Sequence, residues 1–166
     1  TTLAHAAADR LRQEGKTVVQ LDGDGLRRGL CSDLGFSRAD REENLRRVAQ
    51  VARLLGQQGI TVVASLVTPT VRDREIVRGI AGDALVSIFV DCPVEECARR
   101  DVKGHYARAA RGDLKGFTGV DDLFERPPEG EPRVVTSGVA IADSLDEVLA
   151  VFGRTPDSQS KSSLRE

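Results

Sequence analysis

Short apolar runs alternate with helical stretches along this chain, and two of the runs lead directly into an aspartate. Residues 17–21 run into Asp22, residues 60–67 are almost continuously apolar and rich in β-branched side chains, and residues 84–90 run into Asp91. Such runs are typical of strands that are buried on both faces. Strands that alternate with helices favour a parallel, doubly wound sheet with right-handed crossovers. The predicted fold class is therefore α/β, with ligands beyond the carboxyl ends of the strands.

The stretches between these runs carry helical signals. Residues 1–14 repeat apolar side chains at helical spacing before Gly15. Ser37, followed three residues later by Asp40, is an N-terminal capping arrangement, and the helix that it opens is expected to close at residues 57–59. The other expected elements are a helix from Thr68-Pro69 with the proline in its first turn, a helix opened by Pro93, a strand over 133–136 and a helix over 144–152.

A single domain accounts for most of the chain. Its 166 residues are 40% apolar, which is enough for one sizeable core. We expect this domain to span residues 1–153. Residues 155–160 lack apolar content, and we expect residues 154–166 to form a disordered tail.

Composition also argues against several classes of partner and site. The formal net charge of -2 comes without a basic block, so we expect no nucleic acid partner. No apolar run approaches the roughly 18 residues of a membrane span, so we expect no membrane partner. The cysteines, Cys31, Cys92 and Cys97, are odd in number and form no C-x-x-C pair. They argue against a disulfide scaffold and a zinc site and favour a reduced cytoplasmic compartment.

Two carboxylates and an arginine follow the first expected strand. Asp22, Asp24 and Arg27 are interleaved with Gly23 and Gly25, which we expect to let the backbone turn tightly. A carboxylate at this edge of a sheet can orient a hydroxyl or hold a water of Mg²⁺, and the arginine can meet an anion. The same D-G-D-G pattern is also a common turn, so the residues alone leave both interpretations open.

A second group lies around the start of the helix that Ser37 caps. Arg41 continues the apolar stripe of this helix at its first turn, where a charge requires an anionic partner. Asn44 lies on the adjoining face, and Phe36 in the preceding loop is a candidate for stacking on a base. A hydrophobic staple for Phe36 and an ordinary first-turn ion pair for Arg41 are the simpler interpretation.

A third group follows the helix that Pro93 opens. Residues 103–119 are rich in glycine and basic side chains, so we expect a mobile surface segment that extends from Lys103 to beyond Phe117. With Arg100 before it, such a segment could close as a lid on polyphosphate and a base. A solvated charged helix and loop would fit the composition equally well. His105 is expected to be a surface residue rather than a general base.

One expected motif is missing from the chain. A phosphoryl-transfer enzyme of this architecture carries G-x-x-x-x-G-K-[ST] between its first strand and first helix, and no such stretch occurs here. A helix that follows such a loop begins with the Ser or Thr of the motif, and this chain begins with Thr1 and Thr2. We therefore expect the first strand and the phosphate loop to lie upstream of Thr1.

Three segments together resemble the adenylylsulfate kinase family, P-loop enzymes that phosphorylate the 3'-hydroxyl of adenosine 5'-phosphosulfate with MgATP. They are LDGDGLRRGLCSDLGFSRADREENLRR at 21–47, FVDCP at 89–93 and DVKGHYARAARGDLKGFTGV at 101–120. They occur in the order and spacing of the family, and the resemblance extends over residues 1–152. It implies a three-layer P-loop kinase fold and a role in sulfate activation.

The resemblance also implies roles for single residues. Asp24 would orient or deprotonate the attacking hydroxyl, Asp22 would support it near the metal, and Lys103 would meet the transferring phosphoryl group. The substrate would be held by Arg27, Phe36, Arg41, Asn44 and Phe117, with the two phenylalanines clamping its adenine. Arg100 would lie against the adenine of ATP, and Thr1 would place its hydroxyl on Mg²⁺.

The chain departs from the family pattern in two further places. Gly25 stands where the family usually has Asn, and residues 68–71 read T-P-T-V where the family has a segment resembling S-P-Y-R. The second change removes an aromatic and an arginine beside the substrate, a loss that Arg72 or Arg74 would have to make good. These departures bear on substrate affinity, whereas the absent phosphate loop bears on ATP binding.

The sequence thus predicts that the full-length protein makes 3'-phosphoadenylylsulfate, and that residues 1–166 alone lack kinase activity. Two alternatives remain. One is a non-catalytic nucleotide-sulfate binding or regulatory module, and the other is a P-loop kinase for another small alcohol. A homodimer, or a fusion or complex with ATP sulfurylase, is the expected assembly.

Overall fold

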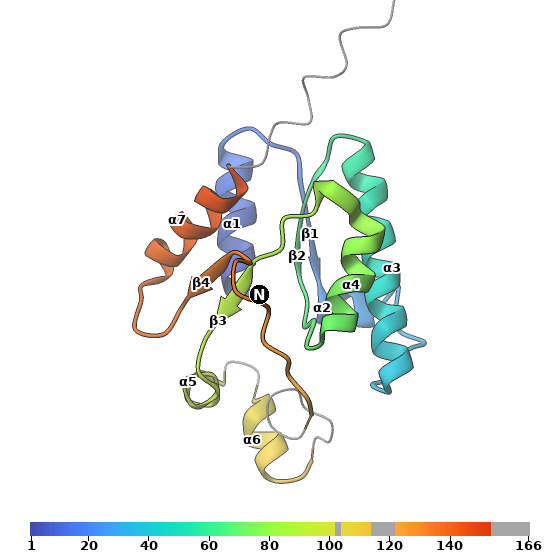
Figure 1. Ribbon diagram of the computed structural model, residues 1–166, viewed down its shortest axis with the longest axis vertical. Helices are drawn as coiled ribbons and strands as arrows, with labels where there is room; N and C mark the ends of the chain where they lie inside the picture. Colours follow the sequence, from blue (N-terminus) through green and yellow to red (C-terminus); the bar gives the residue numbers. More distant parts are fainter. Residues whose placement is uncertain (102–103, 114–121, 154–166) are drawn as a thin grey trace, which may run out of the picture.

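Parallel strand pairs flanked by helices make up the part of the chain that the structure describes. The computed structural model describes residues 1–101, 104–113 and 122–153 (Figure 1). The strands are β1 (Val18–Asp22), β2 (Thr61–Ser65), β3 (Phe89–Asp91) and β4 (Arg133–Val135). β1 pairs with β2, and β3 pairs with β4, both in parallel. The α/β class with parallel strands is confirmed, but the described strands form two separate two-stranded sheets rather than one continuous sheet.

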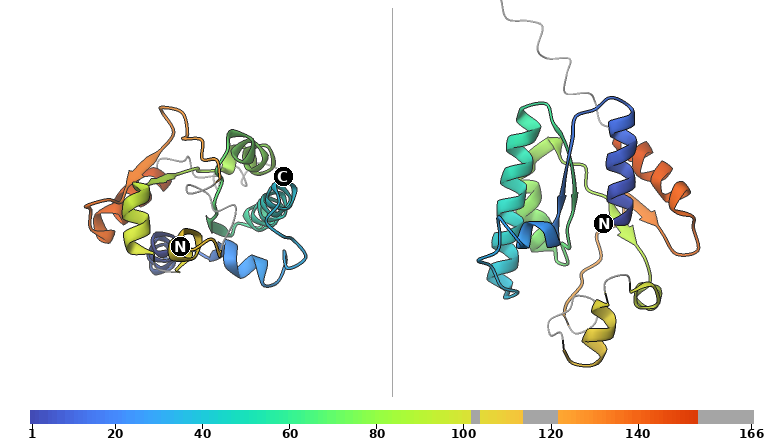
Figure 2. Two further views of the ribbon diagram at one scale, coloured as in Figure 1. Left: turned by 90° about the horizontal axis from the view of Figure 1, so that it is seen from below. Right: turned by 180° about the vertical axis from the view of Figure 1, so that it is seen from behind.

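Helices cover both strand pairs. Those in the described residues are α1 (Thr2–Gln13), α2 (Gly23–Arg27), α3 (Arg38–Gln57), α4 (Val71–Ala81), α5 (Val94–Arg100), α6 (His105–Ala110) and α7 (Ile141–Phe152), with a 3₁₀ turn η1 (Gly82–Ala84). α1 packs against β1, β2 and α7, whereas α3 packs against α4 and β2 (Figure 2). α1 therefore connects the first strand pair to the helix that packs on β4. The short helices α2, α5 and α6 lie toward the end of the molecule at which the strands finish (Figure 1).

The helical periodicities of the sequence are confirmed at α1 and α3. In α1 the predicted stripe is buried at Ala7, Ala8 and Leu11. In α3 the stripe is buried at Leu45 and Val48. These side chains form the core together with Cys31, Leu21, Ala49, Val134 and Leu145. The helix starts also follow local chemistry, since the Ser37 hydroxyl accepts a hydrogen bond from the backbone N–H of Asp40, at 3.2 Å.

Two predicted strands are shorter than the apolar runs that suggested them. The run over 60–67 forms a strand only over Thr61–Ser65, its residues are half-buried or exposed, and Val67 is 65% exposed. The run over 84–90 enters the ladder only at Phe89. A strand persists only where a neighbour supplies hydrogen bonds, and β4 offers three residues to β3. The prediction that the 60–67 strand is buried on both faces is wrong for the described residues.

Helix boundaries differ from the prediction in three places. Pro69 lies outside α4, because Thr70 is the N-cap. α7 begins at Ile141, and Ser144, the expected start, lies within the helix and donates to the carbonyl oxygen of Ala140. Residues 103–119, expected to be a mobile segment, contain the helix α6 in their described part.

The structure also shows the state of the cysteines and the character of the helices. Cys31 is buried, Cys92 and Cys97 are half-buried, and all three are free thiols. Within residues 1–101, 104–113 and 122–153, none of the helices combines the length and the apolar character needed to cross a membrane.

Candidate active site

Asp22 joins four elements at the carboxyl ends of β1 and β2. Its Oδ1 accepts hydrogen bonds from the hydroxyl of Thr1, at 3.0 Å, and from the hydroxyl of Ser65, at 3.1 Å. Its Oδ2 accepts the backbone N–H of Gly25 at 3.3 Å and so caps α2. The start of α1, the ends of both strands and the start of α2 therefore meet at one carboxylate. The side chains of Thr1, Asp22 and Ser65 form a cluster that we call the Asp22 cluster.

Asp24 and Arg27 stand on α2, directly beside this cluster. The expected tight turn is a short helix instead, and neither Gly23 nor Gly25 adopts a positive φ. The glycines are therefore not required by backbone geometry, which corrects the prediction. A Cβ at Gly25 would meet Arg28 Nη2 at 3.9 Å, an ordinary contact, so the local packing would also accept a side chain there. The helix places Asp24 in its first turn and Arg27 at its end.

Arg27 and Phe36 are brought together across the loop between α2 and α3. The guanidinium of Arg27 lies 4.5 Å from the centre of the Phe36 ring, and its Nη1 donates to the carbonyl oxygen of Gly35 at 2.8 Å. Phe36 remains 66% exposed. A hydrophobic staple would pack Phe36 on the fourth residue of α3, but that residue is Arg41. The staple interpretation is therefore wrong, and the exposed ring with a cation beside it can receive a flat ligand.

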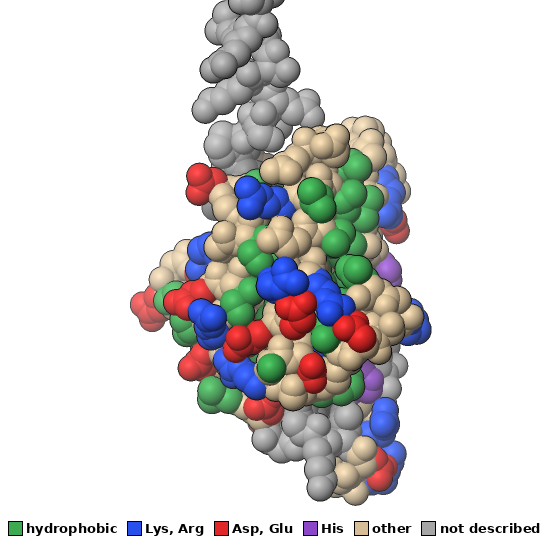
Figure 3. Space-filling model, turned by 90° about the vertical axis from the view of Figure 1, so that its right-hand side faces the viewer, with side chains coloured by type: hydrophobic (Ala, Val, Ile, Leu, Met, Phe, Trp, Pro, Cys, Tyr) green, Lys and Arg blue, Asp and Glu red, His purple; other side chains and the backbone are tan. Residues whose placement is uncertain are grey.

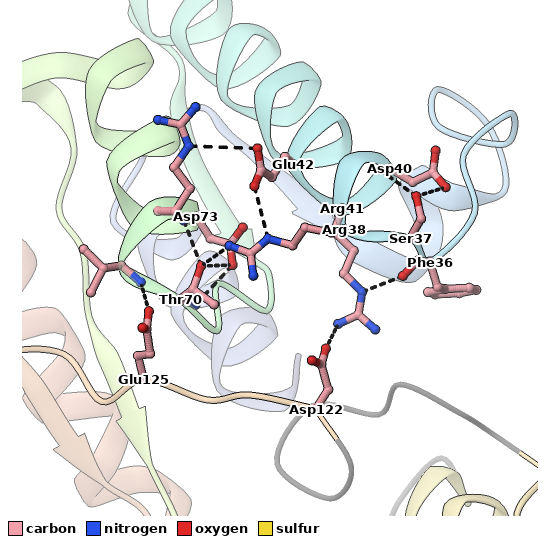
Figure 4. Close-up of polar contacts among 12 residues, drawn as sticks. Phe36, Ser37, Arg38, Asp40, Arg41, Glu42, Thr70, Asp73, Asp122 and Glu125 are labelled. Atoms are coloured by element: carbon pink, nitrogen blue, oxygen red, sulfur yellow. Dashed lines mark hydrogen bonds and ion pairs between the residues drawn. The ribbon is translucent and has the colours of Figure 1, made fainter.

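Among the contacts of Arg41 are two groups of the described chain that lie far apart in the sequence. Its Nε donates to the carbonyl oxygen of Phe36 at 3.0 Å, and its Nη1 donates to Asp122 Oδ2 at 3.0 Å (Figure 4). The anionic partner that the sequence required is thus a carboxylate 81 positions further along the chain, not a first-turn neighbour. Asn44, one turn later, is buried, and no donor among the described residues reaches its Oδ1.

Arg47 fixes the loop that carries Phe36. Its two terminal nitrogens reach the two carboxylate oxygens of Asp33 at 2.7 and 2.8 Å, and its Nε donates to Glu43 at 2.8 Å. Hydrogen bonds from Arg46 and then from Arg47 lower the pKa of Glu43 to about 2. The hydrogen bond from Arg47 also lowers the pKa of Asp33. A bidentate arginine therefore ties this loop to α3.

The N-terminus of α4 is held by a buried capping box. The hydroxyl of Thr70 donates to Asp73 Oδ2 at 2.6 Å and accepts the N–H of Asp73, while Arg38 Nη2 donates to it at 3.0 Å (Figure 4). Arg74 is 8% exposed and donates to the carbonyl oxygens of Thr68 and Glu125.

Arg72, the other candidate to replace the lost arginine, is exposed and pairs with Glu42 at 3.9 Å. Acidic and basic side chains alternate over the face that lies on the right in Figure 1, where α3 and α4 pack together (Figure 3). Arg72 thus faces a protein carboxylate, and Arg74 faces backbone carbonyls.

Arg100, the last residue of α5, contacts the second strand pair. It donates to Glu96 at 2.7 Å and to the carbonyl oxygen of Thr136, just beyond β4, at 2.8 Å. Hydrogen bonds from Arg99 and then Arg100 lower the pKa of Glu96 to about 2. The remaining two predicted site residues, Lys103 and Phe117, lie outside the described residues.

Several residues at this edge were missed by the sequence analysis. Ser65 could have been found, because it is a polar residue inside the apolar run over 60–67, and the structure places it at the end of β2. The sequence contains no pattern that predicts a role for Asp122, Glu125 or Arg126. They lie in no periodic element, and their partners are far away in the sequence. Arg126 pairs with the carboxylate of Asp91, at the end of β3.

A pocket of about 740 Å³ lies away from these residues. It is formed by the ends of α4 and α7 and by the segments that lead into β3 and β4. It is lined by Arg78, Gly82, Asp83, Leu85, Val86, Ser87, Gly130, Glu131, Pro132, Arg133 and Val151. These residues do not include the Asp22 cluster, Phe36 or Arg41. The residues of the candidate site are therefore identified by their chemistry and not by this pocket.

Parallel α/β strands with carboxylates and arginines beyond their carboxyl ends place ligands at that edge of the sheet. The chain superposes on solved APS kinases with TM-scores up to 0.84, which shows the class, the kinases of P-loop fold. Within that class the family is clear. The family model described as adenylylsulphate kinase matches residues 1–135, and the chain belongs to this family.

Individual relatives agree with this assignment. An adenylyl-sulfate kinase of Paraburkholderia xenovorans is 46% identical over 150 residues, which are 90% of this chain and 84% of that protein. The structure of the Mycobacterium tuberculosis APS kinase CysC in complex with AMPPNP and APS superposes with a TM-score of 0.84 at 38% identity, over 92% of this chain and 89% of that one. The bifunctional enzyme NodQ of a Rhizobium species is 45% identical over 147 residues. The matched part is 88% of this chain and 23% of NodQ.

Proposed function

We propose that this protein transfers the γ-phosphoryl group of ATP to the 3'-hydroxyl of adenosine 5'-phosphosulfate. The observation that carries the proposal is the arrangement around α2, which begins at the end of β1. Asp22 caps this helix, Asp24 stands in its first turn, and Arg27 at its end lies 4.5 Å from the exposed ring of Phe36, whose carbonyl oxygen accepts from Arg41. The family membership and the relative solved with AMPPNP and APS support the same reaction. The product is 3'-phosphoadenylylsulfate.

Asp24 is the proposed base. The 3'-oxygen attacks the γ-phosphorus in line, its proton passes to the Asp24 carboxylate, and the bond from the γ-phosphorus to the bridging oxygen of ADP breaks. The position of Asp24 in the first turn of α2, two residues after Asp22, supports this role. Positioning and charge neutralisation supply most of the rate in such transfers.

The substrate is held by the loop and the first turns of α3. Phe36 offers an exposed ring for the adenine, with Arg27 beside it. Arg41 receives the phosphosulfate group, and Asn44 supports it from the same helix. Phe117, from outside the described residues, is proposed as the second ring of the clamp.

ATP binding is supported by family membership, and Mg²⁺ is proposed as its companion ion. The Asp22 cluster fits this ion, because two hydroxyls and a carboxylate are hard oxygen donors and Mg²⁺ usually takes one or two protein oxygens beside phosphate oxygens and water. Thr1 and Asp22 would hold it, and it would neutralise phosphate charge. Arg100 is proposed to lie against the adenine of ATP, and Lys103 to meet the transferring group.

A wider assembly is also proposed. The chain is 45% identical to a part of a bifunctional NodQ enzyme, which supports a second activity fused to it or bound by it. ATP sulfurylase, fused or bound, is the proposed partner. A homodimer is the simplest form of the chain on its own.

The central test is the Asp24→Asn variant, assayed on the protein as its gene encodes it. We expect the turnover number to fall by about a hundredfold or more, because the amide cannot accept the proton. The dissociation constant of adenosine 5'-phosphosulfate, measured by calorimetry, should change little. Wild-type turnover in this variant would contradict the assigned role of Asp24.

Phe36→Ala is the matched contrast. Loss of base stacking should raise the Michaelis constant for adenosine 5'-phosphosulfate by about tenfold and leave the turnover number largely intact. Together the two variants separate chemistry from binding. A protein that binds the sulfated nucleotide but neither binds MgATP nor turns over would instead be a non-catalytic binding module.

A further inference from the structure

Arg41 already holds an anion that belongs to the protein. Its guanidinium donates to Asp122 Oδ2 at 3.0 Å, and the Arg41 side chain is 20% exposed whereas that of Asp122 is 41% exposed. Figure 4 places the carboxylate of Asp122 directly at the guanidinium that reaches down from the start of α3. A carboxylate and a phosphate or sulfate oxygen present the same acceptor geometry to an arginine.

The two oxygens of Asp122 have different partners. Oδ1 accepts the backbone N–H of the next residue, Leu123, at 2.9 Å, and Oδ2 accepts from Arg41. The first bond is local and fixes the carboxylate on its own segment. Only the second bond would have to break for Asp122 to release Arg41.

The segment that follows Asp122 is anchored without Arg41. The N–H of Glu125 donates to the carbonyl oxygen of Pro69 at 2.7 Å, and its carboxylate accepts the N–H of Val71 at the start of α4, at 2.6 Å. Arg126 then pairs with the carboxylate of Asp91. The segment can therefore keep its place when the contact between Asp122 and Arg41 opens, and an exposed ion pair adds little stability of its own.

The charge of Asp122 also reaches a second cation. The pKa of Arg38 is raised mainly by its hydrogen bond to Glu42, with smaller contributions from the charges of Asp73, Glu42 and Asp122. Arg38 lies one turn before Arg41 on α3 (Figure 4). Removing the carboxylate of Asp122 would therefore make the start of α3 more positive at two side chains.

We propose that the Asp122 carboxylate occupies the position on Arg41 that the phosphosulfate group of the substrate takes, so that the substrate binds by displacing Asp122. This inference rests on the function proposed above. Asp122 acts as an internal competitor, which keeps the guanidinium oriented when no substrate is bound and lowers the apparent affinity for anions. We call this displacement of Asp122 from Arg41 the exchange. It favours charged over uncharged nucleosides, because an uncharged ligand cannot replace the carboxylate on Arg41.

The test uses Asp122→Asn, which keeps the size of the side chain and an oxygen for the N–H of Leu123. Calorimetry with adenosine 5'-phosphosulfate and with adenosine gives two dissociation constants for each protein. We expect the variant to bind the sulfated nucleotide about two- to fivefold more tightly, the range that an exposed ion pair corresponds to. Adenosine should bind both proteins equally.

Asp9→Asn is the control, because it removes the same charge from an exposed ion pair with Arg12 on α1. It should leave both constants unchanged. If wild-type protein binds the sulfated nucleotide and Asp122→Asn binds it equally or more weakly, Asp122 positions Arg41 instead of competing, and the exchange is refuted. A wild-type protein that binds neither ligand would contradict the proposed function itself, and the exchange with it.

Discussion

Single side chains at this site are placed by arginines that bind more than one partner. Arg41 joins the carbonyl of Phe36 to Asp122, and Arg47 joins Asp33 to Glu43. Each guanidinium offers several donors in one plane, so a single residue can fix a loop against a helix. The exposed ring of Phe36 depends on these contacts, because little else covers it.

Glu43 gives a prediction at this scale. Its pKa is lowered from 4.5 to about 2 by hydrogen bonds from Arg46 and Arg47, so its contribution to stability is present above pH 4.5 and is lost as the pH falls to about 2. Glu43→Gln should therefore lower the melting temperature at pH 7. The difference from wild type, followed by circular dichroism, should shrink between pH 4.5 and pH 2. A difference that stays constant over this range would show that the charge of Glu43 does not contribute.

At the scale of elements, helix starts follow from short sequence patterns, and strand lengths do not. The capping pairs Ser37 with Asp40 and Thr70 with Asp73 use residues three apart. The sequence predicts the first cap, but the proline at position 69 predicts an earlier start for the second helix than Thr70 gives it. The strand ends, by contrast, depend on the partner strand. The apolar runs over 60–67 and 84–90 are both longer than the strands that pair within them.

Thr70 provides the prediction at this scale. Its buried hydroxyl donates to Asp73 Oδ2 and accepts the N–H of Asp73, so Thr70→Val leaves that buried N–H without its acceptor and removes one hydrogen bond from the carboxylate. We expect the free energy of unfolding to fall by about 1–3 kcal/mol, measured by urea denaturation. Thr70→Ser retains the hydroxyl and should recover most of the loss. If the serine and valine variants are equally destabilised, the methyl group matters more than the cap.

At the scale of the whole molecule, residues 122–126 connect the two strand pairs. Asp122 contacts α3, Glu125 contacts the start of α4, and Arg126 contacts the end of β3. α1 makes a second connection, since it packs on β1, β2 and α7. The residues of the proposed site are thus held in register by a segment that carries no recognisable motif.

Arg74 tests this connection. Its buried guanidinium donates to the carbonyl oxygens of Thr68 and Glu125, which ties the segment to α4. Arg74→Met should accelerate hydrogen exchange at the amide of Glu125, which donates to Pro69, by about tenfold or more. Arg53→Met, on an exposed part of α3, is the control and should leave this amide unchanged. Unaltered protection in Arg74→Met would mean that the contacts of Arg74 do not hold the segment in place.

The sequence by itself determined the α/β class, most of the helices, the cap at Ser37 and the family, because these depend on local periodicity, on bonds between residues three or four apart and on ordered motifs. Tertiary structure alone decided that Arg41 meets Asp122, that Asp22 gathers Thr1 and Ser65, and that the described strands form two pairs. These contacts join residues 21 to 81 positions apart. No local pattern encodes such a contact, because its partner is chosen by how the elements pack.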